Sequence, residues 1–320
     1  MEHAITPLAA FDVQNGTAVP VAEPWPALAP DNGYRWLHLD LNAPGTRAWL
    51  AAHLPPIAAK ALMAEETRPR AEHMADGTIV VLRGVNMNPG AQVDDMVSLR
   101  CWLTPVGLVT VRLRRLMAVQ ELQETLTDPQ AALPATPARA LTMIVAGLIT
   151  RIETVSLELE DRVDTLEDVS LESGSTAANL AQLQRRIIKL RRYVGPQREA
   201  LARLAQTDTP WLDAPARAAL REWTNAAARS VEELEANRDR LAVLQNHLDA
   251  QQNAIVSRHG YILSVVAAVF LPLGFLSGLF GVNIAGMPGM DTPWAFAALC
   301  AVCLAIAAAL FAYFRYHKWL

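Results

Sequence analysis

Two stretches near the C-terminal end of the chain contain no Lys, Arg, Asp or Glu. They are the 22 residues Tyr261–Val282 and the 23 residues Thr292–Phe314. An α-helix of about 20 apolar residues spans the roughly 30 Å hydrocarbon core of a bilayer. The pattern therefore predicts two transmembrane helices, joined by a short loop over residues 283–291 and followed by a basic tail, residues 315–320.

The charges that flank these stretches predict their orientation. Arg258 and His259 precede the first stretch, the sequence RYHKWL follows the second, and the connection 283–291 contains no Lys or Arg. Lys and Arg stay on the cytoplasmic side of a membrane. No basic start with a short apolar core marks a cleavable signal peptide in the first thirty residues. We expect a multi-pass membrane protein with both termini in the cytoplasm.

Short apolar runs separated by turn signals fill the N-terminal third. Asn15-Gly16, Asp76-Gly77 and Asn88-Pro89-Gly90 interrupt the pattern where hairpins need turns. The expected strands are His3–Val13, Tyr34–Asn42, Thr78–Met87, Met96–Thr104 and Gly107–Leu113, and the expected helices are Arg47–Leu54 and Pro55–Glu66. We interpret residues 1–135 as a mixed α/β domain, so the fold class is an α+β cytosolic domain with long helices behind it.

Residues 136–212 have a helical pattern and are expected to form a hairpin. Apolar residues recur every three or four positions at Ile152, Val155, Leu159, Val163, Leu166 and Val169. The segment Arg151–Glu172 has eight acids against two arginines, whereas Arg185–Arg203 has seven bases against one acid. We expect these oppositely charged arms to face each other in an antiparallel hairpin, with attraction of cations by the acidic arm as a secondary effect.

Residues 213–282 are predicted to form one stalk helix that continues into the first membrane span. No Gly or Pro lies between Pro215 and Gly260. The apolar stripe has a spacing near 3.5, as in coiled coils. Its members are Leu220, Trp223, Ala227, Val231, Leu234, Leu241, Leu244, Leu248, Ile255 and Ile262. A helix of this length, roughly 100 Å, needs packing partners from end to end.

Candidate chemistry is sparse. The sequence contains no phosphate-binding G-x-x-x-x-G-K-[ST], no H-E-x-x-H, no G-x-S-x-G and no G-x-G-x-x-G, so nothing indicates an enzyme. The net charge of −4 and the three scattered cysteines favour neither a nucleic-acid partner nor a disulfide framework. Cys300 and Cys303 form C-x-x-C inside the second span, where packing explains them better than a metal site. No resident cofactor is expected.

The first span combines small residues with an unusual end. Its stripe has steps of 3, 4, 4 and 3 and consists of Gly260, Leu263, Ala267, Leu271 and Gly274. Gly274 and Gly278 form a small-xxx-small pair, which lets helices approach closely. The run FLPLGFLSGLFGVN then ends at Gly281, Val282 and Asn283. A lone asparagine there is commonly a helix C-cap.

This run resembles the first transmembrane helix of the CorA superfamily of divalent-cation transporters, which ends in Gly-Met-Asn. The valine of Gly281-Val282-Asn283 resembles the zinc-transporting, ZntB-type branch. AGMPGM after the motif and EETRPR at Glu65–Arg70 point to the same branch. The order of domains agrees with the superfamily over the whole chain. The resemblance implies zinc uptake into a bacterial cytoplasm across the inner membrane, with a magnesium or cobalt channel of the same architecture as the alternative.

The resemblance also implies a funnel-shaped homopentamer whose pore is lined by the first span of each copy. Gly281, Val282 and Asn283 would form the selectivity motif, with five asparagines at the outer mouth. The pore-lining residues would be Gly260, Leu263, Ala267, Leu271 and Gly274, although an ideal helix projected back from Asn283 faces Leu276 instead. Leu263 and Leu271 would be apolar constrictions that close by dewetting.

The residues themselves do not identify the metal ligands. Zinc prefers nitrogen and sulfur ligands, and the first span has no His, Cys or carboxylate. Asp291, in the outer loop, and His259 lie only at the ends of the spans, so no proton relay is predicted. A membrane-anchored coiled-coil sensor is a competing hypothesis, and it predicts an ordinary outer loop and a separate catalytic motif.

Overall fold

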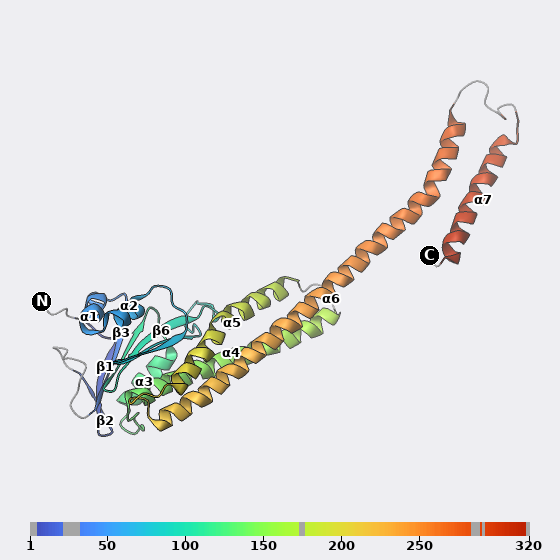
Figure 1. Cartoon of the computed structure of the whole chain (residues 1–320). Coiled ribbons are helices and arrows are strands. Elements are labelled where there is room, and N and C mark those ends of the chain that lie inside the picture. The colour runs from blue at the N-terminus through green and yellow to red at the C-terminus, as the bar shows by residue number, and fades with distance from the viewer. Residues whose placement is uncertain (1–4, 22–32, 173–176, 283–288, 290–291, 318–320) are drawn as a thin grey trace. The chain divides into compact units, whose positions relative to one another are not determined.

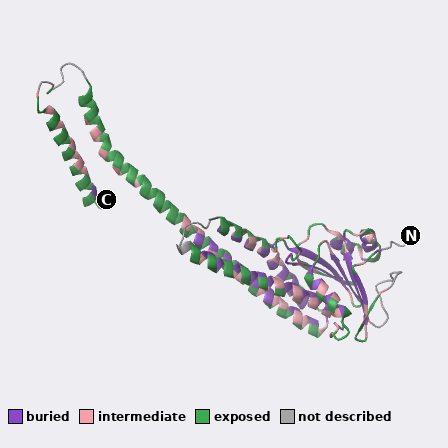
Figure 2. Cartoon of the chain, turned by 180° about the vertical axis from the view of Figure 1, so that it is seen from behind, coloured by how far each residue is buried: buried purple, intermediate pink, exposed green. Residues whose placement is uncertain are grey.

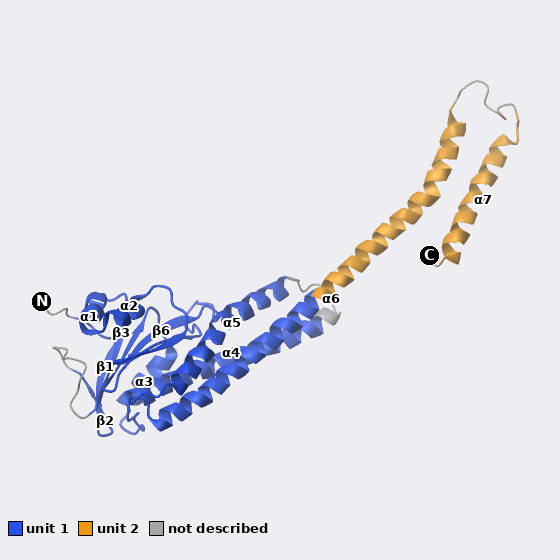
Figure 3. Cartoon of the chain, in the orientation of Figure 1, with its two compact units in different colours: residues 1–245 blue, residues 246–320 orange. Residues whose placement is uncertain are grey.

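The computed structural model describes residues 5–21, 33–172, 177–282, 289 and 292–317. Two compact units divide the chain, residues 1–245 and residues 246–320 (Figure 3). Figure 1 shows the order of the elements along the chain.

The first unit is built on a seven-stranded mixed sheet. Its strands are β1 (Ala9–Gln14), β2 (Thr17–Pro20), β3 (Tyr34–Asp40), β4 (Arg70–Met74), β5 (Gly77–Gly84), β6 (Val97–Leu103) and β7 (Gly107–Arg112). They are arranged in the order β2-β1-β3-β7-β6-β5-β4. Only the central pair β3 and β7 is parallel, and all other described neighbours are antiparallel. The expected mixed fold of this region is confirmed.

The turn signals in the sequence mark real hairpins. Asn15 and Gly16 both have positive φ, 49° and 77°, in the tight turn that joins β1 to β2. Positive φ at both central residues is typical of the Asn-Gly hairpin turn. Ala75 and Asp76 form the turn that joins β4 to β5, and Gly77 is the first residue of β5. The short edge strands β2 and β4 were not expected, because four or five residues with exposed side chains give little apolar signal.

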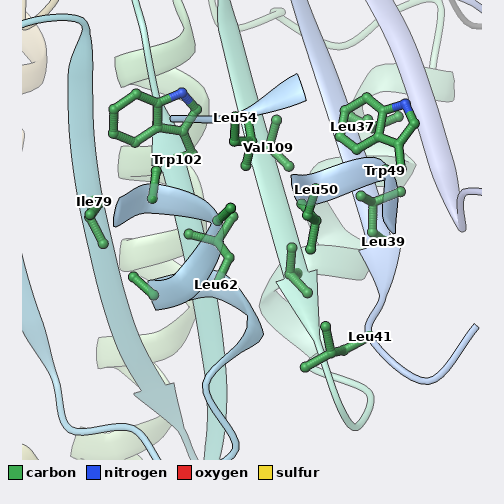
Figure 4. Packing of buried hydrophobic residues seen from close by; sticks show 14 of the residues in the cluster. Leu37, Leu39, Leu41, Trp49, Leu50, Leu54, Leu62, Ile79, Trp102 and Val109 are labelled. Atoms are coloured by element: carbon green, nitrogen blue, oxygen red, sulfur yellow. The ribbon is translucent and has the colours of Figure 1, made fainter. Parts of the chain in front are cut away.

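Helices α1 (Thr46–His53) and α2 (Pro56–Met63) cover one face of the sheet. Leu50 and Leu62 of these helices are fully buried against Leu39, Ile79 and Val109 of the strands (Figure 4). Full burial of a leucine side chain stabilises the fold by about 1.5–3 kcal/mol. This layer fixes where α2 ends, and therefore where the segment leading into β4 begins.

Helices α3 (Met117–Thr127) and α4 (Pro137–Glu172) lie on the other face, where α4 contacts β3, β5 and β7. Gly84 of β5 allows this approach, because a Cβ there would lie 2.5 Å from the side chain of Leu148. The helical segment Pro137–Val169 is also long and apolar enough to cross a membrane by composition. Because 56% of its most apolar window is buried within the protein, α4 is a core helix.

Helices α5 (Ala177–Gln206) and α6 (Ala214–Gly281) complete the helical part. The stripe predicted on α4 is buried from Ile152 to Leu166, and only Val169 is exposed. On α6 the predicted stripe is buried at Leu220, Ala227, Val231, Leu234, Leu241 and Leu244. Ile255 and Ile262 are about half exposed, 50% and 49%. Packing of the stripe within this chain therefore ends near Leu244.

The expected pairing of the acidic and basic arms is wrong. Among the described residues, the ion pairs of the α4 acids join α6, and those of the α5 bases join the β5–β6 loop and α6. The pairs are Arg229–Glu153, Arg240–Asp164, Arg240–Glu167, Arg186–Asp94, Lys189–Asp94, Lys189–Asp95 and Arg191–Glu235. The charged side chains of the two arms thus pair with α6 and with the β5–β6 loop rather than with each other.

The second unit contains the end of α6 and the helix α7 (Ala295–Tyr316). Both have the length and apolarity to cross a membrane, and only 6% and 0% of their most apolar windows is buried. Figure 2 shows the C-terminal part of α6 and α7 as mainly exposed. Apolar side chains exposed over this length are stable in lipid and not in water, in agreement with the two predicted spans.

We predict that Asp94→Asn destabilises the first unit by about 2 kcal/mol, because it removes a buried carboxylate that accepts charge-assisted contacts from Arg186 and Lys189. The Asp94 side chain is 3% exposed and contacts Arg186 at 3.3 Å and Lys189 at 3.1 Å. Thermal unfolding of the purified protein, followed by tryptophan fluorescence, measures the loss. Asp95→Asn is the control and should cost at most about 1 kcal/mol, because Asp95 is 50% exposed. Equal shifts in both variants would contradict this assignment.

Candidate ion pathway

The five residues predicted to line a pore lie on one uninterrupted helix. Gly260, Leu263, Ala267, Leu271 and Gly274 all belong to α6. At about 100° per residue, they fall within one narrow face of the helix. All five are exposed in the single chain, with Leu263 at 69% and Leu271 at 75%. This face therefore has no packing partner in the described part of the chain.

The opposite face of α6 is the one turned toward α7. Its members are half-buried and recur at helical spacing, namely Tyr261, Val265, Val269, Leu273 and Leu276. Leu276 and Phe280 line a hollow of about 710 Å³ together with Trp294, which directly precedes α7, and Leu299 of α7. Leu276, the alternative position given by ideal projection from Asn283, thus lies away from the Leu263–Leu271 face.

No close neighbour in the described part of the chain explains the glycines on the apolar part of α6. A Cβ added at Gly260, Gly274, Gly278 or Gly281 would meet no described atom within 4 Å. Glycine costs a helix about 1 kcal/mol relative to alanine. Close approach of another helix is the usual reason for glycine in membrane helices, and no helix of the described chain makes that approach.

The polar groups of this segment are satisfied within the helix itself. Ser264 donates a hydrogen bond to the carbonyl oxygen of Gly260 at 2.9 Å, and Ser277 donates to that of Gly274 at 3.1 Å. The span Tyr261–Val282 has no His, Cys or carboxylate, and no group of three potential metal-binding side chains occurs among the described residues. The side chains of this segment therefore offer no nitrogen, thiolate or carboxylate ligand that could replace the water around a metal ion.

The proposed selectivity motif lies where the helix ends. Gly281 is the last residue of α6, and Val282 follows it. Asn283 and Asp291 lie outside the described residues. The motif is thus described only up to the valine.

Comparison with known proteins identifies the family. The family model described as "CorA-like Mg2+ transporter protein" matches residues 31–316. The chain belongs to this family. Two curated relatives are the zinc transport protein ZntB of Yersinia enterocolitica, 34% identical, and the divalent cation transporter CmaX of Pseudomonas aeruginosa, 35% identical. Each match covers 89% of this chain and 88% or 87% of the relative.

Solved structures of similar proteins have the same fold. The full-length CmaX protein matches with a TM-score of 0.81 at 32% identity, over 98% of both chains. The CorA magnesium transporter of Methanocaldococcus jannaschii matches with a TM-score of 0.79 at 16% identity, over 99% of this chain and all of the other. The second match supports the fold alone. The family is one of ion transporters, not enzymes, and the chain is a divalent-cation transporter of the membrane.

The sequence did not reveal which face of each span packs within the chain. On α7 the less exposed positions include Ala295, Leu299, Ile306 and Leu310, again at helical spacing. Cys303 is half-buried and Cys300 exposed, and neither forms a disulfide. Both spans are apolar on all sides, so periodicity of hydrophobicity could not separate lipid-facing from helix-facing positions. The exposure of each residue in the folded chain distinguishes the positions that face a neighbouring helix from those that do not.

Proposed function

We propose that this protein takes up zinc into the cytoplasm through a pore surrounded by five copies of the chain. The observation that carries the proposal is the exposed α6 face Gly260–Gly274, which is free of charge and lies opposite the α7-facing side. Relatives at 34% and 32% identity are named zinc transport proteins, which supports zinc as the cargo. Zinc is the transported ion in this proposal and not a resident cofactor.

Two features of the single chain support an assembly of copies. The apolar stripe of α6 is buried as far as Leu244 and half exposed from Ile255 onward. Gly274 and Gly278 have no close neighbour in the described part of the chain that would require glycine. Contacts between copies would cover the stripe and use the glycines. Two spans cannot enclose a pore, so several copies must surround it, and five is the number that the resemblance to the superfamily implies.

The proposed pathway has an amide ring outside and apolar rings inside. Five copies of Asn283, set after Gly281 and Val282, would hydrogen-bond the water shell of an arriving ion without removing it. Leu271 and Leu263 would narrow the pore and close it by dewetting. Asp291, in the outer loop, would add negative charge near the mouth and raise the local cation concentration.

Voltage is sufficient to drive uptake. A divalent ion that moves into a cell with an inside-negative potential gains about 4.6 kcal/mol per 100 mV. Proton coupling would need a titratable relay, and none of the residues Tyr261–Val282 is His, Asp or Glu. His38 of the first unit cannot serve, because burial and nearby Arg112 lower its pKa to about 3 and keep it neutral.

We also propose the location and domain division that follow from the sequence. The protein would lie in a bacterial inner membrane with both termini in the cytoplasm. The proposed parts are an α/β domain (1–135), a helical hairpin (136–212), a stalk and first span (213–282), an outer loop (283–291), a second span (292–314) and a basic tail (315–320). The basic residues on either side of the two spans support this orientation.

Magnesium uptake is the second candidate. The matching family model is described as a Mg²⁺ transporter. The absence of His and Cys from the Tyr261–Val282 segment also suits a hard ion that keeps its water. A cobalt or magnesium channel would use the same ring and the same apolar constrictions.

We predict that liposomes containing the purified protein accumulate zinc and not magnesium when the interior is negative. Fluorescent indicators for the two ions measure the uptake, with voltage and proton gradient set independently. Uptake should increase with voltage and be unchanged by a proton gradient alone. Uptake of magnesium without zinc would support the second candidate, and uptake of neither would contradict the transport proposal for both ions.

We predict that Asn283→Ala abolishes most zinc uptake, because the outer ring loses its amide oxygens. The assembly should survive the change, since the amide is not required for packing of the spans. Asn253→Ala is the matched control, because Asn253 is exposed on α6 before the first span. Chemical crosslinking and size-exclusion chromatography verify the assembly of both variants. Unchanged uptake by Asn283→Ala would refute the ring.

We predict that a cysteine at position 271 reacts with a small, positively charged thiol reagent and blocks uptake, whereas one at position 276 does not. Leu271 lies on the exposed face and Leu276 on the α7-facing side. The background protein carries Cys300→Ala and Cys303→Ala; Cys101 is fully buried. Equal reactivity of Leu271→Cys and Leu276→Cys would show that the 271 face does not line a water-filled path.

A further inference from the structure

A second hollow, lined by arginines, lies entirely within the first unit. The segment before and at the start of β4, the helix α5 and the unit-one part of α6 form its walls. Its volume is about 660 Å³, within the range of small-molecule sites. Five arginines and two glutamates contribute to the lining, namely Arg68, Arg70, Arg191, Arg198, Arg203, Glu199 and Glu235. The pathway described above uses none of them.

Most of this positive charge has no counterion among the residues that the structure describes. Arg70 pairs with Glu72 at 3.1 Å, and Arg191 lies 3.8 Å from Glu235. The other three arginines, Arg68, Arg198 and Arg203, make no ion pair or hydrogen bond from the side chain within the described part of the chain. Glu199 is the remaining acid of the hollow and is exposed. Since arginine stays protonated, three cations face one carboxylate here.

Arg83 connects the two segments that carry these arginines. The Nη2 atom of Arg83 donates to the carbonyl oxygen of Thr67 at 2.7 Å, directly before Arg68. The backbone N–H of Arg83 donates to Oε1 of Gln197 at 2.6 Å, directly before Arg198. Arg83 therefore ties the β4 side of the hollow to the α5 side. A site fixed in advance loses less conformational entropy when a ligand binds.

Buried contacts anchor the β4 side further. Arg100 is fully buried and donates from Nη2 to the carbonyl oxygen of Ala64 at 2.8 Å, and Pro69 is buried. These contacts hold the segment before Arg68, and the pairing of Arg70 with Val81 of β5 holds it after Arg68. Arginines concentrated on a fixed surface repel one another, and a bound anion would relieve that repulsion.

We propose that this hollow binds an oligophosphate of nucleotide size. Guanidinium groups form bidentate hydrogen bonds with phosphate oxygens, and several phosphates in series match several arginines better than a single anion does. Pro196, Ala200 and Val231 add apolar lining for the rest of such a molecule. The proposal does not depend on the transported ion or on the number of copies.

Calorimetry on the purified full-length protein tests the proposal. ATP, inorganic tripolyphosphate and inorganic phosphate are titrated separately, with EDTA present so that metal chelation gives no signal. We expect ATP and tripolyphosphate to bind more tightly than phosphate, with an affinity that falls as salt increases. Equal affinity of the first two would assign recognition to the phosphates alone, and tighter binding of ATP would add the nucleoside. Both outcomes support the site, and no binding of any probe overturns it.

Two variants localise the binding. Arg198→Gln with Arg203→Gln should weaken tripolyphosphate binding by about tenfold or more, because two charge-assisted contacts are lost. Arg221→Gln is the matched control, since Arg221 is exposed on α6 and does not line the hollow. Thermal unfolding verifies the fold, and Arg68→Gln replaces the double variant if that one unfolds. Wild-type affinity in a folded variant would overturn the assignment.

Discussion

The apolar surface of α6 is the constraint on which the rest of the structure depends. The helix is 68 residues long, and its stripe is buried only as far as Leu244. Beyond that point the large side chains Leu263 and Leu271 are 69% and 75% exposed. Water does not tolerate an apolar surface of this extent. A bilayer can cover the outer side of this surface, and we propose that further copies of the chain cover its inner side.

The N-terminal part of α6, as far as residue 245, belongs to the first unit and packs within it. The sheet of this unit is covered on both faces, by α1 and α2 on one side and by α3 and α4 on the other. Arg240 pairs with Asp164 and Glu167, so two carboxylates of α4 hold one side chain of α6. Ion pairs of this partly exposed kind contribute little stability each. Their value is in fixing which face of α6 turns toward α4.

Features that depend on local periodicity and apolarity were predicted correctly from the sequence. Both spans, the continuous helix through Gly260 and the turn at Asn15-Gly16 were all readable, because each depends on neighbouring residues. The edge strands β2 and β4 were missed, since they are short and bury few side chains.

The sequence did not show which charged residues, far apart along the chain, form ion pairs. Lys189 was expected to face the acidic arm of the hairpin, yet it contacts Asp94 and Asp95. Opposite charge identifies possible partners, and only the fold decides among them. The candidate pathway was predictable as a stripe on the first span, because Gly260 to Gly274 share a face. That Leu276 lies on the opposite side, facing α7, could not be predicted from the sequence, because it depends on which residues are covered in the folded chain.

The number of copies is the most direct test of this account. Native mass spectrometry of the full-length protein, released from detergent micelles, weighs the intact assembly. We expect a main species of five times the chain mass of 34.9 kDa. A monomer or dimer that still transports zinc in liposomes would contradict the shared pore, because two or four spans cannot surround an ion path lined by the Leu271 face.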